Sequence, residues 1–330
     1  MNIGTVLVTG ANGFLGKTIL SQLLSEGLTM CGTDIGSAPA AIGNAFQKAD
    51  ITRPEELIGV IGSATTVIHA AGLAHIFDKS NLSNAPFEAI NEQGTANVAR
   101  AAVKGGVRHF VLISSVSVYG DSLNGGNENS SCYPQGPYAQ SKYQAEQRAI
   151  EIANESSMAL TILRLATLYG EGDPGNVARL MRTIDRGRFI WIGNGSNRKS
   201  LLHREDAARA CLAVIQNPAS GVNIFNVSAP PCTMREVVAG LAGALGKRIP
   251  SFDIPASLAR GMSGLLSRLP LIRLQTRATV QKWLADDVYD ATKFDQAFNF
   301  QPRVSLVEGL HREVVWYRAE QAKREKNRKF

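Results

Sequence analysis

The chain has 330 residues, of which 44% are hydrophobic and 19% charged, with 31 Gly and 13 Pro. These proportions exclude a disordered, collagen-like or coiled-coil chain, and the length favours about two domains. Lys and Arg outnumber Asp and Glu by 35 to 28, and the net charge of +7 suits a nucleic acid, an anionic membrane surface or an anionic substrate as partner.

The first half of the chain alternates apolar, β-branched runs with helical patterns, which is typical of βαβ units. Strands are predicted at 3–9, 28–34, 65–70, 109–115 and 160–165, and helices near 13–26, 87–104 and 138–154. Because such crossovers are right-handed, the pattern predicts an α/β fold, a Rossmann doubly wound parallel sheet.

The elements become shorter after residue 170. We therefore predict a Rossmann domain over 1–170 and a smaller mixed α/β substrate-binding domain over 171–330. Residues 220–228 predict a strand that returns to the Rossmann sheet, so that the two domains interleave, and 319–330 form a basic tail.

A glycine-rich loop joins the first strand to the first helix. Gly10, Gly13 and Gly16 have the GxxGxxG spacing, which allows a tight turn and close approach of the backbone to a pyrophosphate. The alternative is a βα turn without a ligand.

Asp34 ends the second strand about 20 residues later, where a carboxylate accepts hydrogen bonds from ribose hydroxyls and repels a 2′-phosphate. No Lys or Arg follows until Lys48, so NAD is favoured over NADP. A turn cap at the strand end is the alternative role for Asp34.

A possible acid/base pair opens the helix at 138–154. Tyr138 and Lys142 are four residues apart and share a helix face, and a nearby cation favours the phenolate form of tyrosine. A solvated helix face is the alternative for an isolated pair of this kind. Ser115 ends the strand at 109–115, so its hydroxyl and Tyr138 should meet at the carboxyl edge of the sheet.

Several motifs in this order resemble one family. TGANGFLG, HAAG, SSVSVYG, YAQSK and LRLATLYG are similar to segments of the extended short-chain dehydrogenase/reductases, the NAD-dependent epimerase/dehydratase group, and the similarity covers nearly the whole chain. The resemblance implies that 1–170 binds NAD and that the chain forms a homodimer through the helices at 87–104 and 138–154.

The resemblance also assigns residues. It makes Tyr138 the acid/base, makes Lys142 the residue that binds the nicotinamide ribose and lowers the Tyr138 pKa, and has Ser115 hydrogen-bond the reacting oxygen. The implied cofactor-binding residues are Gly10, Asn12, Gly13, Phe14, Leu15, Gly16, Asp34, Asp50, Ile51, Ala70, Ala71, Gly72, Asn91, Tyr138 and Lys142.

The substrate implied by the resemblance is a nucleotide sugar. Lys199 stands where relatives often have Arg, and Thr167 replaces an Asn that many 4-epimerases carry. The missing Asn and the loop at 73–86 are more similar to UDP-sugar 4-epimerases or 4-ketoreductases of surface-polysaccharide biosynthesis. The implied substrate-binding residues are Ser115, Ser117, Asn176, Arg198 and Lys199.

Two alternatives remain open. The segment 254–274 contains no acidic residue and is similar to an insertion in 3β-hydroxysteroid dehydrogenases, which would make a sterol or other lipid alcohol the substrate. It would then cover the substrate cleft or lie on a membrane, the first being favoured. The other alternative is a catalytically silent NAD-binding regulator, against which the intact Ser115, Tyr138 and Lys142 argue.

The positive charge is confined to two segments. Residues 254–285 hold five cations and no acid, and 319–330 hold five cations and two acids. This distribution favours a local anion contact, a substrate diphosphate before a membrane surface, over a nucleic-acid partner.

The start of the chain, its longest uncharged stretch and its cysteines bear on location and on metal binding. The chain does not open with a charged and then apolar signal segment, and glycines interrupt the stretch at 57–77, so a cytoplasmic location without a membrane span is predicted. Four separated cysteines predict buried free thiols and no metal site: Cys31, Cys132, Cys211 and Cys232.

Overall fold

The structure of the chain is a computed structural model that describes residues 3–39, 42–74, 84–120, 126–255, 257 and 283–327. Most of the loop at 73–86 and of the apolar segment 254–274 lies outside these residues, as does the end of the predicted tail. The sterol alternative and the membrane contact, which depended on that segment, are therefore predictions on which the described residues do not bear.

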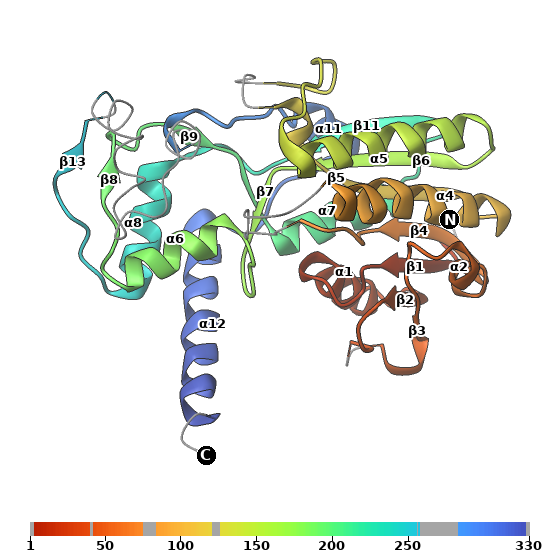
Figure 1. Ribbon diagram of the computed structural model, residues 1–330, viewed down its shortest axis with the longest axis horizontal. Helices are drawn as coiled ribbons and strands as arrows, with labels where there is room; N and C mark the ends of the chain where they lie inside the picture. Colours follow the sequence, from red (N-terminus) through yellow and green to blue (C-terminus); the bar gives the residue numbers. More distant parts are fainter. Residues whose placement is uncertain are drawn as a thin grey trace.

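A seven-stranded parallel sheet forms the larger half of the molecule (Figure 1). The strand order is β11-β6-β5-β4-β1-β2-β3, and every neighbouring pair is parallel, which confirms the doubly wound α/β prediction. The chain reverses its direction of winding between β1 and β4, where open α/β sheets bind their ligands. The strands are β1 (Thr5–Thr9), β2 (Met30–Asp34), β3 (Phe46–Lys48), β4 (Ala64–His69), β5 (His109–Ser115), β6 (Ala159–Leu165) and β11 (Val222–Val227).

Helices cover both faces of this sheet. In β1, Val6 and Val8 face one apolar core and Leu7 the other, which explains the unbroken apolar run at the start of the chain. The first core is closed by α1 (Phe14–Ser25) and α7 (Arg204–Gln216), and the second by α2 (Pro54–Ile61), α4 (Gly94–Lys104) and α5 (Gly136–Asn154).

The helix predicted at 87–104 is continuous but not uniform. It begins as α3 (Ala85–Phe87), passes through the π-helical turn η2 (Glu88–Gln93), and continues as α4. A π turn inside an α-helix rotates the side chains that follow it and is frequent at functional sites. Asn91, singled out in the sequence, lies in this turn.

The rest of the chain builds a smaller, mixed body beside the sheet (Figure 1). Its core packs Met181 of α6 (Asn176–Asp185) with Leu241 of α8 (Met234–Leu245) and Val314 of α12 (Leu306–Asn327). The remaining strands pair as β7 (Thr167–Tyr169) with β10 (Leu201–His203), β8 (Trp191–Ile192) with β13 (Asp253–Ile254), and β9 (Arg198–Lys199) with β12 (Cys232–Thr233).

Local sequence explains why α8 starts and stops where it does. The Thr233 hydroxyl accepts a hydrogen bond from the Glu236 N–H at 3.1 Å, and the Glu236 carboxylate accepts one from the Thr233 N–H at 2.7 Å. This capping box pairs backbone donors that a helix start leaves free. Gly246 ends the helix at φ +64°, a conformation that favours glycine.

More segments from the second half of the chain belong to the Rossmann half than the sequence predicts. The strand expected at 220–228 is β11, and it joins the Rossmann sheet by pairing with β6. Two later helices also cover the Rossmann sheet, α7 and α11 (Thr292–Phe298), the latter through Phe294 against Phe225 of β11. Elements on both sides of residue 170 therefore pack into the same apolar core. The division into a cofactor-binding and a substrate-binding domain at that residue stays a prediction.

Two smaller predictions need correction. Residues 319–327 of the predicted tail are helical and continue α12, which projects from the body (Figure 1). Cys211 is buried, whereas Cys31, Cys132 and Cys232 are only partly buried, and all four thiols are free. Within the described part of the chain, no helix combines the length and the apolar character needed to cross a bilayer.

Candidate active site

The backbone between β1 and α1 is packed so closely that its three glycine positions have little room for a side chain. Gly10 has a φ of +66°, which residues with a Cβ rarely adopt. A Cβ on Gly16 would lie 2.0 Å from the Gly10 carbonyl oxygen, and one on Gly13 would lie 3.0 Å from it. No side chain caps the start of α1, so its first N–H groups are available to phosphate oxygens. The loop fits the pyrophosphate of a dinucleotide.

Asp34 lies directly against this loop. Its Oδ2 accepts a hydrogen bond from the Asn12 N–H at 3.0 Å, and its Oδ1 accepts one from the Gly36 N–H at 2.9 Å. The second contact is the turn cap considered above as an alternative. Each carboxylate oxygen can accept more than one hydrogen bond, so the cap does not prevent Asp34 from binding ribose hydroxyls.

Five more of the predicted cofactor-binding residues follow β3 and β4. Asp50 accepts hydrogen bonds from the N–H and hydroxyl of Thr52, at 2.9 and 2.8 Å, and these lower the pKa of its carboxyl. Ile51 beside it is buried. Ala70 and Ala71 continue from β4 to Gly72, and a Cβ added there would lie 3.1 Å from the Asn91 Oδ1 and 3.8 Å from the Lys142 Nζ. The backbone thus passes close to the catalytic candidates.

Tyr138, Ser115 and Lys142 come together at the carboxyl edge of β5. Burial raises the Tyr138 pKa, and the neighbouring Ser115 hydroxyl opposes this by lowering it. Lys142, one turn further along α5, is 8% exposed and donates from Nζ to the Ile113 carbonyl at 2.5 Å. Burial lowers the pKa of Lys142 to about 8, against the opposing charge of Glu146. A phenol, a hydroxyl and a buried ammonium so arranged can move a proton to and from an alcohol oxygen.

Asn91 supports this group through the backbone. Its Oδ1 accepts from the Leu73 N–H at 2.7 Å, and its Nδ2 donates to the Leu73 carbonyl at 3.0 Å and to the Ser141 hydroxyl at 2.9 Å. Ser141 donates in turn to the Tyr138 carbonyl at 2.9 Å. The π turn therefore places Asn91 where it links the chain after β4 to the helix that carries Tyr138.

The predicted substrate-binding residues lie in different environments. Ser117 has a buried hydroxyl without a hydrogen-bond partner among the described residues. Asn176 is exposed at the first position of α6. Arg198 and Lys199 are adjacent in β9 and point to opposite sides: Arg198 is exposed, whereas Lys199 is 8% exposed and donates from Nζ to the Ala285 carbonyl at 2.9 Å.

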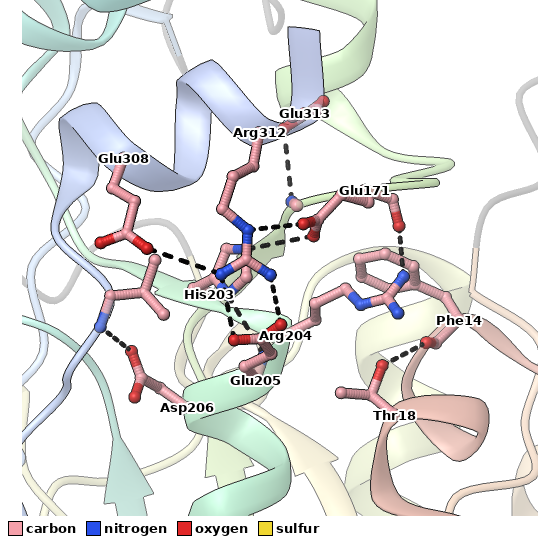
Figure 2. Close-up of polar contacts among 12 residues, drawn as sticks. Phe14, Thr18, Glu171, His203, Arg204, Glu205, Asp206, Glu308, Arg312 and Glu313 are labelled. Atoms are coloured by element: carbon pink, nitrogen blue, oxygen red, sulfur yellow. Dashed lines mark hydrogen bonds and ion pairs between the residues drawn. The ribbon is translucent and has the colours of Figure 1, made fainter. Parts of the chain in front are cut away.

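A cluster of ionic contacts connects the glycine loop to the smaller body (Figure 2). The Arg204 guanidinium lies 5.4 Å from the centre of the Phe14 ring and donates to the Glu171 carbonyl. The Glu171 carboxylate is held by Arg312 of α12, with Nε 2.6 Å from Oε1, and Arg312 also pairs with Glu205. Sequence reasoning missed this cluster because Glu171 and Arg312 are 141 positions apart.

Comparison with known proteins identifies the family of the chain. Residues 6–228 match the NAD dependent epimerase/dehydratase family. The N-acetyl-alpha-D-glucosaminyl-diphospho-ditrans,octacis-undecaprenol 4-epimerase of Escherichia coli O157:H7 is 30% identical over 94% of both chains. The UDP-glucose 4-epimerase of Vibrio cholerae is 28% identical over 77% of this chain and 79% of its own. The structure of MoeE5 in complex with UDP-glucuronic acid and NAD matches with a TM-score of 0.77 at 25% identity, over 96% of this chain and 100% of the other. The resemblance inferred from the motifs is confirmed.

Proposed function

Because the chain belongs to the NAD-dependent epimerase/dehydratase family, we propose that it inverts the 4-hydroxyl of a hexose that carries a diphosphate, with a UDP-sugar as the first candidate substrate. The enzyme class, an NAD-dependent epimerase or oxidoreductase, and the cofactor NAD follow from the family. The observation that carries the proposal is the meeting of Ser115, at the end of β5, with Tyr138 and the buried Lys142 of α5, whose Nζ donates to the Ile113 carbonyl of the same strand.

The glycine loop and Asp34 are the residues that would hold NAD, the loop at the pyrophosphate and the carboxylate at a ribose. When bound, NAD supplies reversible acceptance of hydride from the carbon that bears the reacting hydroxyl. Everything else in the reaction is proton movement and positioning, which the chain's own side chains perform.

Tyr138 acts as the base in this proposal. Its phenolate takes the proton of the 4-hydroxyl, and the positive charge of Lys142 stabilises that phenolate. The Ser115 Oγ accepts a hydrogen bond from the Ser117 N–H at 3.1 Å, which leaves its own hydrogen free to be donated to the sugar oxygen. Tyr138 returns the proton after the 4-keto sugar has presented its opposite face.

The relatives narrow the substrate class. The E. coli relative is named for a sugar on diphospho-undecaprenol and the V. cholerae relative for UDP-glucose, and both sugars are attached through a diphosphate. In this chain, the exposed Asn176 at the start of α6 and the exposed Arg198 are the candidates for that diphosphate. The undecaprenyl-linked sugar is the second candidate substrate, favoured by the 30% identity to the E. coli enzyme.

The test is an incubation in D2O without added cofactor. UDP-glucose, UDP-N-acetylglucosamine, UDP-glucuronic acid and undecaprenyl-diphospho-N-acetylglucosamine are supplied separately, and products are examined by proton NMR. We expect a 4-epimer from at least one of them, with no deuterium at C4, because the hydrogen at C4 leaves and returns as hydride without contact with solvent. Deuterium at C4, or turnover only of 4-keto sugars or sterols with added nicotinamide cofactor, would contradict the proposal.

A further inference from the structure

A fully buried ion pair lies behind the catalytic helix. Glu146 of α5 has no exposed surface and Arg164 of β6 is 4% exposed. The contact is bidentate, with 2.7 Å between the Arg164 Nη2 and the Glu146 Oε2 and 3.0 Å between Nε and Oε1. Glu146 is four residues after Lys142, so the two side chains are neighbours on one face of α5.

The same carboxylate holds the strand that carries Ser115. The hydroxyl of Ser114 donates to the Glu146 Oε1 at 2.5 Å. Ser114 directly precedes Ser115 at the end of β5. Glu146 therefore joins three elements of the site: the helix with Tyr138 and Lys142, the end of β5, and β6.

Arg164 is anchored on its other side. Its Nη1 donates to the Tyr119 hydroxyl at 2.9 Å, and that hydroxyl donates to the Asn226 Oδ1 at 2.8 Å. The guanidinium carbon also lies 4.9 Å from the centre of the Tyr119 ring. The orientation of Arg164, and so of Glu146, is determined by hydrogen bonds from opposite directions.

A contribution to folding stability does not explain why a buried ion pair stands here. Removing two charges from water costs more than their attraction commonly returns, and apolar residues of similar volume are often as stable or more stable. A buried pair in contact with the catalytic strand and one turn from the catalytic lysine therefore calls for another role.

We propose that Glu146, oriented by Arg164, is a positioning residue that keeps Lys142 charged and fixes the end of β5 that presents Ser115. The inference rests on the proposed function of Tyr138 and Lys142. It makes Glu146 part of the machinery that sets the working pH range, although it touches no substrate.

The charged and titratable groups around Lys142 agree with this role. On α5 it faces Tyr138 and Glu146, and on β4 it faces His69, whose pKa burial and the Lys142 charge lower to about 3, so that His69 is neutral. Among the described residues, Glu146 is the charged group that raises the pKa of Lys142. The groups around Glu146 itself are Arg164, Lys142, the Tyr119 hydroxyl and the Cys132 thiol, and burial raises the pKa values of Tyr119 and Cys132 so that both stay neutral.

The decisive variant is Glu146→Gln, which keeps the shape and removes the charge. Loss of a nearby anion lowers the pKa values of both Lys142 and Tyr138, so both limbs of the pH profile of kcat/KM should move to lower pH, by on the order of one unit. Glu146→Asp retains the charge and should restore the position of the limbs at reduced kcat. Glu155→Gln, at the exposed end of the same helix, is the matched control and should leave the profile in place.

A second readout does not depend on turnover. In protein labelled with 15N-lysine and saturated with NAD, the Nζ resonance of Lys142, assigned with Lys142→Met, should titrate on the order of one unit lower in Glu146→Gln. If that variant does not fold, the apolar pair Glu146→Leu with Arg164→Met removes both charges and should give the same direction of shift.

Unchanged limbs and an unchanged Lys142 titration in a folded variant would overturn the inference. The proposed function is tested by a different variant. Activity of Tyr138→Phe protein would contradict the proposed function, and the Lys142 titration would still measure the effect of Glu146 on the Lys142 pKa.

Discussion

Glu313 lies on α12 with no exposed surface, and its carboxyl is poorly partnered. The Gly170 N–H is 3.3 Å from Oε2, whereas Oε1 has no hydrogen-bond partner among the described residues. Burial and the nearby Asp173 raise the pKa of this carboxyl to about 9 from an ordinary 4.5. At pH 7 it is therefore protonated in the folded chain and ionised in the unfolded chain.

The consequence for stability has a defined sign. Between the two pKa values the folded state holds a proton that the unfolded state has released, so the free energy of unfolding falls as pH rises. The slope is about 1.4 kcal/mol per pH unit, which amounts to about 3 kcal/mol between pH 5 and pH 7. Glu313→Gln has nothing to ionise, so its stability relative to the wild type should rise by about 3 kcal/mol over the same interval.

Urea unfolding followed by circular dichroism at pH 5 and pH 7 measures this difference. Glu308→Gln is the control, because Glu308 is an exposed glutamate on the same helix, and its difference from the wild type should stay within about 0.5 kcal/mol at both pH values. A Glu313→Gln difference that is equal at the two pH values would show that the carboxyl is ionised in the folded chain and would refute the reasoning.

Three further predictions concern the cofactor loop and the lysine. Asp34→Asn keeps the hydrogen-bond acceptor but removes the charge that repels a 2′-phosphate, and calorimetry should show NADP gaining about tenfold in affinity relative to NAD. Gly16→Ala should abolish NAD binding because its Cβ would lie 2.0 Å from the Gly10 carbonyl, whereas Gly243→Ala, in open space on α8, should bind NAD normally and stabilise the fold by about 0.5–1 kcal/mol. In rates measured from pH 6 to pH 10, kcat/KM should fall as pH rises through about 8, where Lys142 loses its proton, and a flat profile there would contradict its role.

Much of the Rossmann half is predictable because its signals are local. The apolar run Val6–Val8 needs no distant contact to indicate a buried parallel strand, and the glycine spacing limits what the next turn can do. The spacing of Tyr138 and Lys142 places both on one helix face, and the strand end at Ser115 brings it to the same edge of the sheet.

The missed features depend on burial and on distant partners. In the sequence, Lys142 followed by Glu146 has the spacing of an ordinary solvated helix pair, and only the fold shows that Glu146 is buried against Arg164. The sequence assigns both Arg198 and Lys199 to the substrate, and only the fold shows that Arg198 is exposed and Lys199 is buried. The π turn at Asn91 likewise has no local sequence signal.

The central claim is that Tyr138 transfers the proton of the reacting hydroxyl. The most direct measurement is the turnover of Tyr138→Phe at saturating NAD, on whichever diphosphate-linked sugar the wild type epimerises. Proton transfer by a positioned side chain contributes roughly 10²–10⁴-fold, so we predict a fall in kcat of at least about 100-fold with NAD binding retained. A variant that binds NAD and turns over within about threefold of the wild type would contradict the claim.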